Sequence, residues 1–167
     1  MITLVSEAND RQIRVPILLW RRLILDLRRR GGGRGESGAF LLGAERGQRS
    51  VTTTYICYDD LDPNAYQGGG IAFHAVGCAA LWSRCRERRL EILADVHTHP
   101  GDGVGQSEID QRNPMIPVVG HTALIIPRFA FTPWWTLKSV GIYEYLGSFA
   151  WRTHAREIGQ RVVLTLW

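Results

Sequence analysis

Lysine and cysteine are scarce in this sequence. Of the 20 basic residues, Lys138 is the one lysine, so arginine carries almost all of the positive charge. The three cysteines, Cys57, Cys78 and Cys85, form no C-x-x-C pair, which argues against a zinc-finger or thioredoxin-type motif. We expect all three to be buried free thiols.

Long apolar runs are also missing. The longest, at 17–20 and 123–127, fall far short of the roughly 18 residues that a membrane-spanning helix requires. The amino-terminal stretch MITLVSEANDRQ turns polar before an apolar run could act as a signal peptide. We therefore expect a soluble, cytoplasmic protein that has no membrane partner.

The common nucleotide-binding and serine-hydrolase motifs are absent. The stretches GGGRG, GDGVG and QGGGIAFHAVG miss the spacing of a P-loop and of G-x-G-x-x-G, and there is no G-x-S-x-G. The net charge of +4 and the run RRRGGGRG at 28–35 could favour contact with phosphates. We favour the alternative, a charged helix end followed by a flexible turn, and do not expect a nucleic-acid partner.

Length and composition indicate one compact domain. The chain has 167 residues, of which 45% are hydrophobic and 22% are charged, and these values suit a single domain with a sizeable core. No internal repeat or linker is visible. We therefore expect one domain over residues 1–167.

Hydrophobic periodicity predicts a mixed order of helices and strands. A strand at 11–15 leads into a helix that begins at Pro16 and ends at Gly31 to Gly33, because proline suits the first helical turn and glycine the end. The other expected elements are a hairpin of strands 39–43 and 50–58 that turns near Gly47, a loop at 59–70, a helix from about Ile71 with Val76, Cys78, Ala79, Leu81, Trp82 and Cys85 on its apolar face, strands at 90–99, 121–130, 135–147 and 161–167, and a short helix from Ser107 to before Pro114. We therefore expect an α/β fold in which two main helices and one short helix flank a curved, largely antiparallel sheet.

The stretch HTHPGDGVGQSEID at 97–110 concentrates polar side chains around glycines. If the preceding apolar run is a strand, His97 and His99 project from the same face of it. If a helix starts near Ser107, Asp110 lies one turn further and can turn toward these histidines. Two imidazole nitrogens and one carboxylate oxygen suit zinc and leave a fourth ligand position for water.

Each part of this stretch also has a purely structural interpretation. Ser107 and Asp110 fit an S-x-x-acid capping box, which starts many helices that have no catalytic role. A single histidine beside a strand is most often an ordinary polar residue. The complete pattern of H-x-H, seven residues and S-x-x-D is much more specific than any of its parts.

This pattern resembles the signature of the JAB/MPN metalloproteases, also called JAMM proteases. The family carries a glutamate seven residues before a glycine that ends a short apolar strand, and Glu36 fits this position in ESGAFLLG, which ends at Gly43. Ala39 departs from the pattern, because many members have glycine there. The resemblance covers roughly residues 10 to 145, and it leaves the tail from Leu146 to Trp167 unassigned.

The resemblance implies a JAB/MPN-like fold and a role for each motif residue. His97, His99 and Asp110 would hold one zinc ion, which makes hydroxide available at neutral pH. Glu36 would take the proton of the attacking water and pass it to the leaving amine. Ser107 would donate a hydrogen bond to the carbonyl oxygen as it becomes an oxyanion.

The resemblance also implies a substrate class. Active members hydrolyse the isopeptide or peptide bond after the C-terminal tail of ubiquitin or a ubiquitin-like protein, and some prokaryotic members process sulfur-carrier proteins of the same β-grasp shape. The tail would add as a strand to the segment 66–73, in which Gly70, Ile71, Ala72 and Phe73 are the expected substrate-binding residues. A third possibility is a binding scaffold of the kind that has lost zinc, although the intact motif argues against it.

Three further histidines lie outside the motif. We expect His74, His121 and His154 to be structural residues. His121 stands at the start of an expected strand close to the motif, so contact with substrate is the alternative for this residue.

Overall fold

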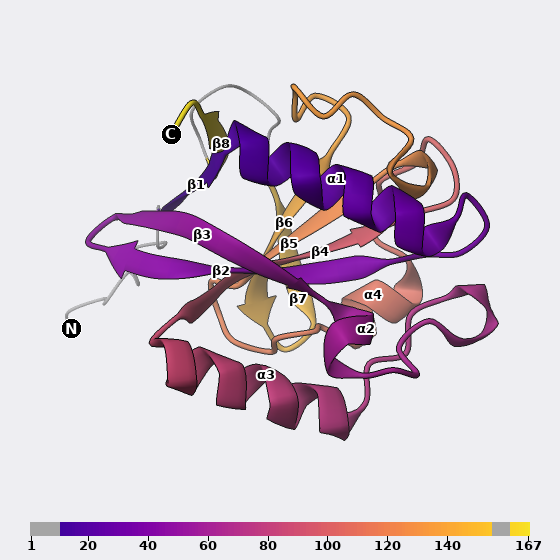
Figure 1. Cartoon of the computed structure of the whole chain (residues 1–167), viewed down its shortest axis with the longest axis horizontal. Coiled ribbons are helices and arrows are strands. Elements are labelled where there is room, and N and C mark those ends of the chain that lie inside the picture. Colours follow the sequence, from indigo (N-terminus) through magenta and orange to yellow (C-terminus); the bar gives the residue numbers. More distant parts are fainter. Residues whose placement is uncertain (1–10, 155–160) are drawn as a thin grey trace, which may run out of the picture.

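The computed structural model describes residues 11–154 and 161–167, and it shows one eight-stranded sheet flanked by helices (Figure 1). The strand order is β7-β6-β5-β4-β2-β3-β1-β8. The elements in chain order are β1 (Gln12–Pro16), α1 (Ile17–Gly31), β2 (Gly38–Arg46), β3 (Arg49–Cys57), α2 (Tyr58–Leu61), η1 (Gln67–Gly69), α3 (Ala75–Arg88), β4 (Glu91–Thr98), α4 (Glu108–Arg112), β5 (Thr122–Ile126), η2 (Arg128–Ala130), β6 (Gly141–Gly147), β7 (Ala150–Thr153) and β8 (Val162–Thr165). The predicted α/β class is confirmed.

The sheet is mixed: antiparallel pairs are the majority, as predicted, and three pairs are parallel, which the sequence did not indicate. The pairs β1–β3, β1–β8 and β4–β5 are parallel, while the other four neighbouring pairs are antiparallel. Parallel neighbours need a long crossover connection. The histidine and glycine stretch, together with α4, belongs to the crossover from β4 to β5, which places it at the carboxyl end of a central parallel strand.

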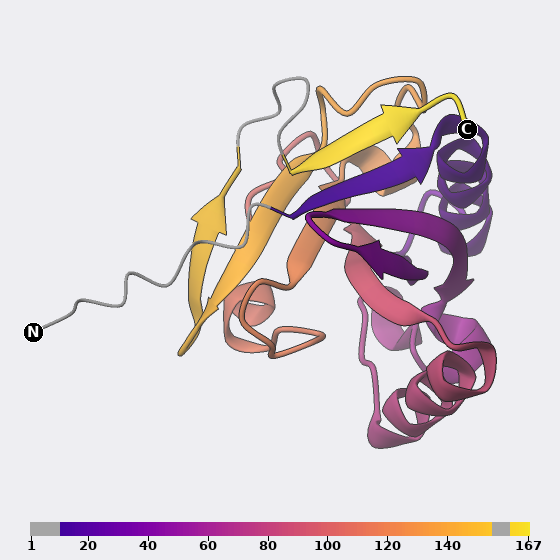
Figure 2. The same cartoon turned by 90° about the vertical axis from the view of Figure 1, so that its left-hand side faces the viewer.

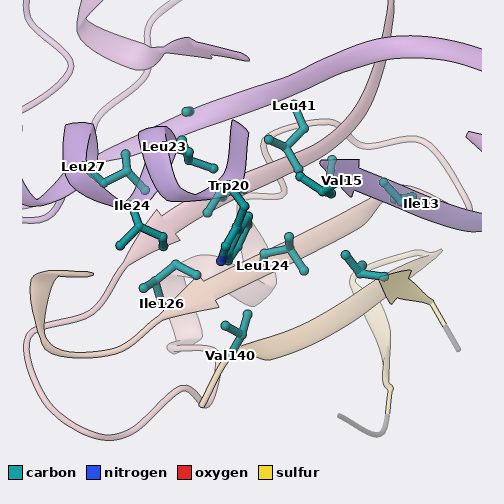
Figure 3. Packing of buried hydrophobic residues seen from close by; sticks show 14 of the residues in the cluster. Ile13, Val15, Trp20, Leu23, Ile24, Leu27, Leu41, Leu124, Ile126 and Val140 are labelled. Atoms are coloured by element: carbon teal, nitrogen blue, oxygen red, sulfur yellow. The ribbon is translucent and has the colours of Figure 1, made fainter. Parts of the chain in front are cut away.

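Helix α1 covers one face of the sheet and α3 covers the other (Figure 1). Apolar residues recur along α1 at Ile17, Trp20, Leu23, Ile24 and Leu27, and all but the half-buried Ile17 are buried. Figure 3 shows the buried side chains packed toward Leu124 and Ile126 of β5. The buried residues of α1 are Trp20, Leu23, Ile24 and Leu27. Pro16 is the N-cap, one position earlier than a first-turn residue, and Gly32 ends the helix with a φ of 57°. The periodicity therefore predicted this helix and its buried face correctly.

Helix α3 begins at Ala75, four residues later than predicted. The carboxylate of Asp62 accepts hydrogen bonds from the backbone N–H of His74 at 2.9 Å and lies 2.6 Å from Nδ1 of the same residue. These contacts hold His74 in an extended conformation, so the helix starts only after it. The predicted apolar face was also wrong in part, because Val76 and Trp82 are 62% and 47% exposed.

Other segments also differ from the prediction. The strand expected at 121–130 ends at Ile126 and is followed by η2, and the strand expected at 135–147 begins at Gly141. The expected loop at 59–70 contains α2 and η1, and strand β7 was not predicted. Of the three free cysteines, Cys57 and Cys85 are buried as expected, while Cys78 is only half-buried. No helix within residues 11–154 and 161–167 is both long and apolar enough to cross a membrane.

The β2–β3 hairpin turns where the sequence indicated. Gly47 has a φ of 62°, a conformation that glycine adopts without strain. Gly43 has no space for a side chain, because a Cβ there would overlap the carbonyl oxygen of Val51 at a β-bulge between the two strands. The close packing of the hairpin therefore explains why the Glu36 motif has glycine at position 43.

Candidate metal centre

Three side chains bring their ligand atoms together at the carboxyl end of β4. The Nε2 atoms of His97 and His99 are 3.2 Å apart, Nε2 of His97 is 3.4 Å from Oδ1 of Asp110, and Nε2 of His99 is 3.3 Å from its Oδ2. Two ligands on a tetrahedral zinc at bond lengths of about 2.0 Å lie roughly 3.3 Å from each other. The donor set therefore fits a zinc ion in both chemistry and spacing.

The sheet positions the two histidines. His97 lies in β4 opposite Gly38 of β2, where a Cβ would overlap the ring of Tyr58. His99 follows the end of β4, and its backbone N–H donates to the carbonyl of Ile126 at 2.8 Å. Its own carbonyl accepts from Phe129 N–H at 2.8 Å. Both imidazoles are thus anchored through the backbone of neighbouring segments.

A capping box positions Asp110. The Ser107 Oγ accepts a hydrogen bond from Asp110 N–H at 3.1 Å, and Oδ2 of Asp110 accepts one from Ser107 N–H at 2.7 Å. Trp151 holds the same helix by donating from Nε1 to the carbonyl of Gln111 at 3.1 Å. It belongs to β7, the edge strand at the left of Figure 2. The structural interpretation of the S-x-x-D pattern is therefore correct. It is compatible with a ligand role, because the cap leaves Oδ1 of Asp110 directed at His97.

Opposite charges shift the pKa values of these groups. Burial raises the pKa of Asp110, but hydrogen bonds from His97 and His99 outweigh it and hold this pKa far below its usual range. Burial lowers the pKa of His97, but the carboxylates of Asp110 and Asp95 outweigh it and raise this pKa. The centre therefore attracts positive charge, whether a proton or a metal ion.

Glu36 precedes β2, and its backbone N–H donates to the carbonyl of Gly69 at 2.8 Å. Burial raises the pKa of its carboxyl group above the ordinary 4.5, partly opposed by the nearby His97 and His99. A raised pKa makes a carboxylate a better proton acceptor, which is the property that a general base needs.

All nine predicted site residues line one cavity of about 880 Å³. Its wall contains Glu36, Gly70, Ile71, Ala72, Phe73, His97, His99, Ser107 and Asp110. The expected substrate segment thus lies beside the candidate metal ligands, although the two are distant in sequence. His121 does not line this cavity; it lines a separate cavity of about 330 Å³.

In the expected substrate segment, 66–73, one backbone N–H group is not available to pair with an added strand. The backbone N–H of Ala72 donates to the carbonyl of Ala65 at 2.8 Å, so this group is already used within the loop. The N–H groups of Ile71 and Phe73 have no partner among the described residues. These two alternate positions can still offer backbone donors to an added strand.

Sequence reasoning missed Asp95, which lies in β4 and is 2% exposed. Its Oδ1 is 2.7 Å from Nε2 of His121, and its Oδ2 is 3.9 Å from Nδ1 of His97. A signal was present, since an acidic residue interrupts an apolar strand two positions before His97 and therefore shares its face.

The remaining histidines pair with carboxylates. His74 contacts Asp62, and Nε2 of His154 lies 2.7 Å from Glu144. These contacts are of the kind expected for structural histidines.

A second group of potential ligands consists of Cys57, Asp59 and Asp60. Arg30 pairs with both aspartates, at 2.9 Å from Asp60. Its guanidinium already pairs with both carboxylates, so this group is an ion-pair cluster.

Comparison with known proteins supports the fold. No protein-family model matches the sequence. The solution structure of a protein from Desulfitobacterium hafniense superposes with a TM-score of 0.64 at 16% identity, covering 92% of this chain and 93% of that chain. The two proteins share a fold. A JAB1/MPN domain protein from Archaeoglobus fulgidus gives a TM-score of 0.48 at 14% identity, covering 91% of this chain and 98% of that chain.

Proposed function

We propose that this protein is a zinc-dependent peptidase of the JAB/MPN type that hydrolyses the bond after the C-terminal tail of a ubiquitin-like protein. The observation that carries the proposal is the geometry of His97, His99 and Asp110, whose ligand atoms are 3.2 to 3.4 Å apart. Three protein ligands leave one position for a reacting molecule, which is typical of catalytic rather than structural zinc.

The chain's own residues would handle the proton and the oxyanion. Zinc, when bound, would supply Lewis acidity that makes a water molecule reactive at neutral pH. The Glu36 carboxylate would accept the proton of the attacking water and deliver it to the nitrogen of the leaving amine. The Ser107 hydroxyl would donate to the substrate carbonyl oxygen, since Oγ accepts from Asp110 N–H and its own hydrogen has no acceptor among the described residues.

The cavity wall suits an extended tail that ends in glycine. Ile71 and Phe73 offer backbone N–H groups at alternate positions of this segment, and Gly70 places no side chain in the way. Strand addition at this segment would hold the tail by its main chain. The scissile bond would then lie beside Ser107 and Glu36, which line the same cavity.

Metal content and cleavage test the proposal together. Purified protein should contain one zinc per chain, and His97→Ala, His99→Ala and Asp110→Ala should each lose it. His154→Ala is the matched control, because this histidine pairs with Glu144 outside the cavity.

The cleavage assay uses three substrates: ubiquitin linked through its C-terminal glycine to a lysine ε-amine, a linear ubiquitin precursor, and a sulfur-carrier protein with a C-terminal extension. Cleavage of the isopeptide indicates deconjugation, and cleavage of only the linear substrates indicates precursor processing. Folded protein that contains almost no zinc and cleaves none of them would favour a binding scaffold instead.

A further inference from the structure

Asp95 stands between the candidate metal ligands and a second histidine. Its carboxylate has one oxygen 2.7 Å from Nε2 of His121 and the other 3.9 Å from Nδ1 of His97. His97 in turn directs its opposite nitrogen, Nε2, at His99 and Asp110. The two nitrogens of His97 therefore face two different acidic groups, and only Nε2 takes part in the candidate metal centre.

Burial of the Asp95 carboxylate restricts which partners can stabilise its charge. Asp95 is 2% exposed, and a buried carboxylate needs charged or hydrogen-bonding partners. Among the described residues, its ion-pair partners are the two imidazoles, with no arginine or lysine beside it. An imidazole stabilises a carboxylate by presenting an N–H group to it. At His97 the 3.9 Å separation is an ion-pair distance and not a hydrogen bond, so the charge of Asp95 favours a hydrogen on Nδ1. This tautomer leaves the lone pair of Nε2 for a metal ion.

His121 is held firmly enough to fix Asp95. Its backbone N–H donates to the carbonyl of Val118 at 3.0 Å, and its carbonyl accepts from Tyr145 N–H at 2.9 Å. Its side chain is almost fully buried. The pair of His121 and Asp95 thus connects the loop before β5 to the centre of β4.

We propose that Asp95 and His121 are positioning residues, in which Asp95 sets the Nδ1–H tautomer and the ring orientation of His97 and His121 holds Asp95 in place. The inference rests on the zinc site of the proposed function. Carboxylates that accept the second N–H of a ligand histidine typically change metal affinity by about 10- to 100-fold when they are replaced. The expected role explains why a carboxylate is buried in an otherwise apolar strand.

The first measurement needs no metal. In zinc-free protein at a pH where its imidazoles are neutral, ¹⁵N NMR should show His97 as the Nδ1–H tautomer. Asp95→Asn should shift His97 toward the Nε2–H tautomer, because the new amide can donate to Nδ1. A wild-type His97 that carries its hydrogen on Nε2 would overturn the inference.

The second measurement is zinc affinity by chelator competition. Asp95→Asn and His121→Phe should each weaken zinc binding by about 10-fold or more. His121→Gln should restore most of the affinity, since its amide can still donate to Asp95. His154→Phe, which removes a histidine at the same 2.7 Å distance from another buried carboxylate, should leave zinc affinity unchanged.

The outcomes separate this inference from the proposed function. A wild-type protein that binds no zinc, yet shows the Nδ1–H tautomer and loses it in Asp95→Asn, would refute the zinc enzyme and retain the positioning role. If the wild type binds zinc and both Asp95→Asn and His121→Phe bind it with an affinity within twofold of the wild type, the positioning role alone is refuted. If Asp95→Asn does not fold, the wild-type tautomer and the His121 variants still decide the question.

Discussion

Replacing Ser107 separates two roles that one hydroxyl group would serve. The Oγ atom accepts from Asp110 N–H and so caps α4, while the hydrogen on Oγ is proposed to stabilise an oxyanion. Ser107→Ala removes both functions. Ser107→Gly also removes the hydroxyl, but glycine is a fair N-cap and costs only a few tenths of a kcal/mol, compared with about 1 kcal/mol for alanine. Ser107→Thr keeps both functions.

The two effects differ enough in size to be distinguished. A loss of about 1 kcal/mol at the cap, even if it appeared entirely in catalysis, would reduce the rate by only about 5-fold. Loss of an oxyanion donor typically reduces kcat by about 10² to 10³. We therefore expect Ser107→Gly and Ser107→Ala to lose at least about 100-fold in kcat/KM, and Ser107→Thr to retain most activity.

Steady-state cleavage of ubiquitin that carries a fluorogenic C-terminal amide measures this series, with zinc content and urea unfolding measured on the same samples. Zinc should remain bound in all three variants, because Ser107 is not a ligand. If Ser107→Gly keeps kcat/KM within fivefold of the wild type, the hydroxyl does not stabilise an oxyanion and serves as a helix cap only.

Three further predictions concern the base, the substrate segment and a strained turn. Glu36→Gln should keep zinc and lose about 10² to 10⁴ in rate. In metal-free protein, Glu36→Gln should also be more stable than the wild type at pH 7. The folded-state pKa of Glu36 is raised, so the stability that the protonated carboxyl contributes is complete below pH 4.5 and is lost as the pH rises through the folded-state pKa. Equal urea midpoints of the two proteins at pH 7 would contradict this. Ile71→Pro should weaken cleavage and leave the melting temperature unchanged, whereas Ala72→Pro should lower the melting temperature because it removes the 2.8 Å bond to Ala65; unchanged kcat/KM in Ile71→Pro would exclude docking at this segment. Arg128→Gly should raise the free energy of unfolding in urea by about 1 kcal/mol, since Arg128 has a φ of 53°, which glycine adopts without strain. A lower urea midpoint would show that the contacts of the Arg128 side chain stabilise the fold by more than its backbone conformation costs.

Local patterns in the sequence were sufficient for several features. The repeat of apolar residues in α1 predicted its buried face, since a helix of 3.6 residues per turn has one side to bury. The H-x-H spacing brought together His97 in β4 and His99 just after its end, and S-x-x-D predicted the cap of α4. Each of these depends on residues fewer than about a dozen positions apart, where backbone geometry alone determines which side chains are neighbours.

Other features depended on contacts that no local pattern contains. The start of α3 was decided by the carboxylate of Asp62, twelve residues before His74, and the mixed character of the sheet by which strands became neighbours. Glu36 lies beside the histidines because β2 pairs with β4, with Gly38 opposite His97. Asp95 became a candidate positioning residue only when the fold placed His121 against it. The sequence by itself determined the ligand types and the local elements that carry them, and the tertiary structure decided which distant groups surround them, because strand pairing and burial join residues far apart in the chain.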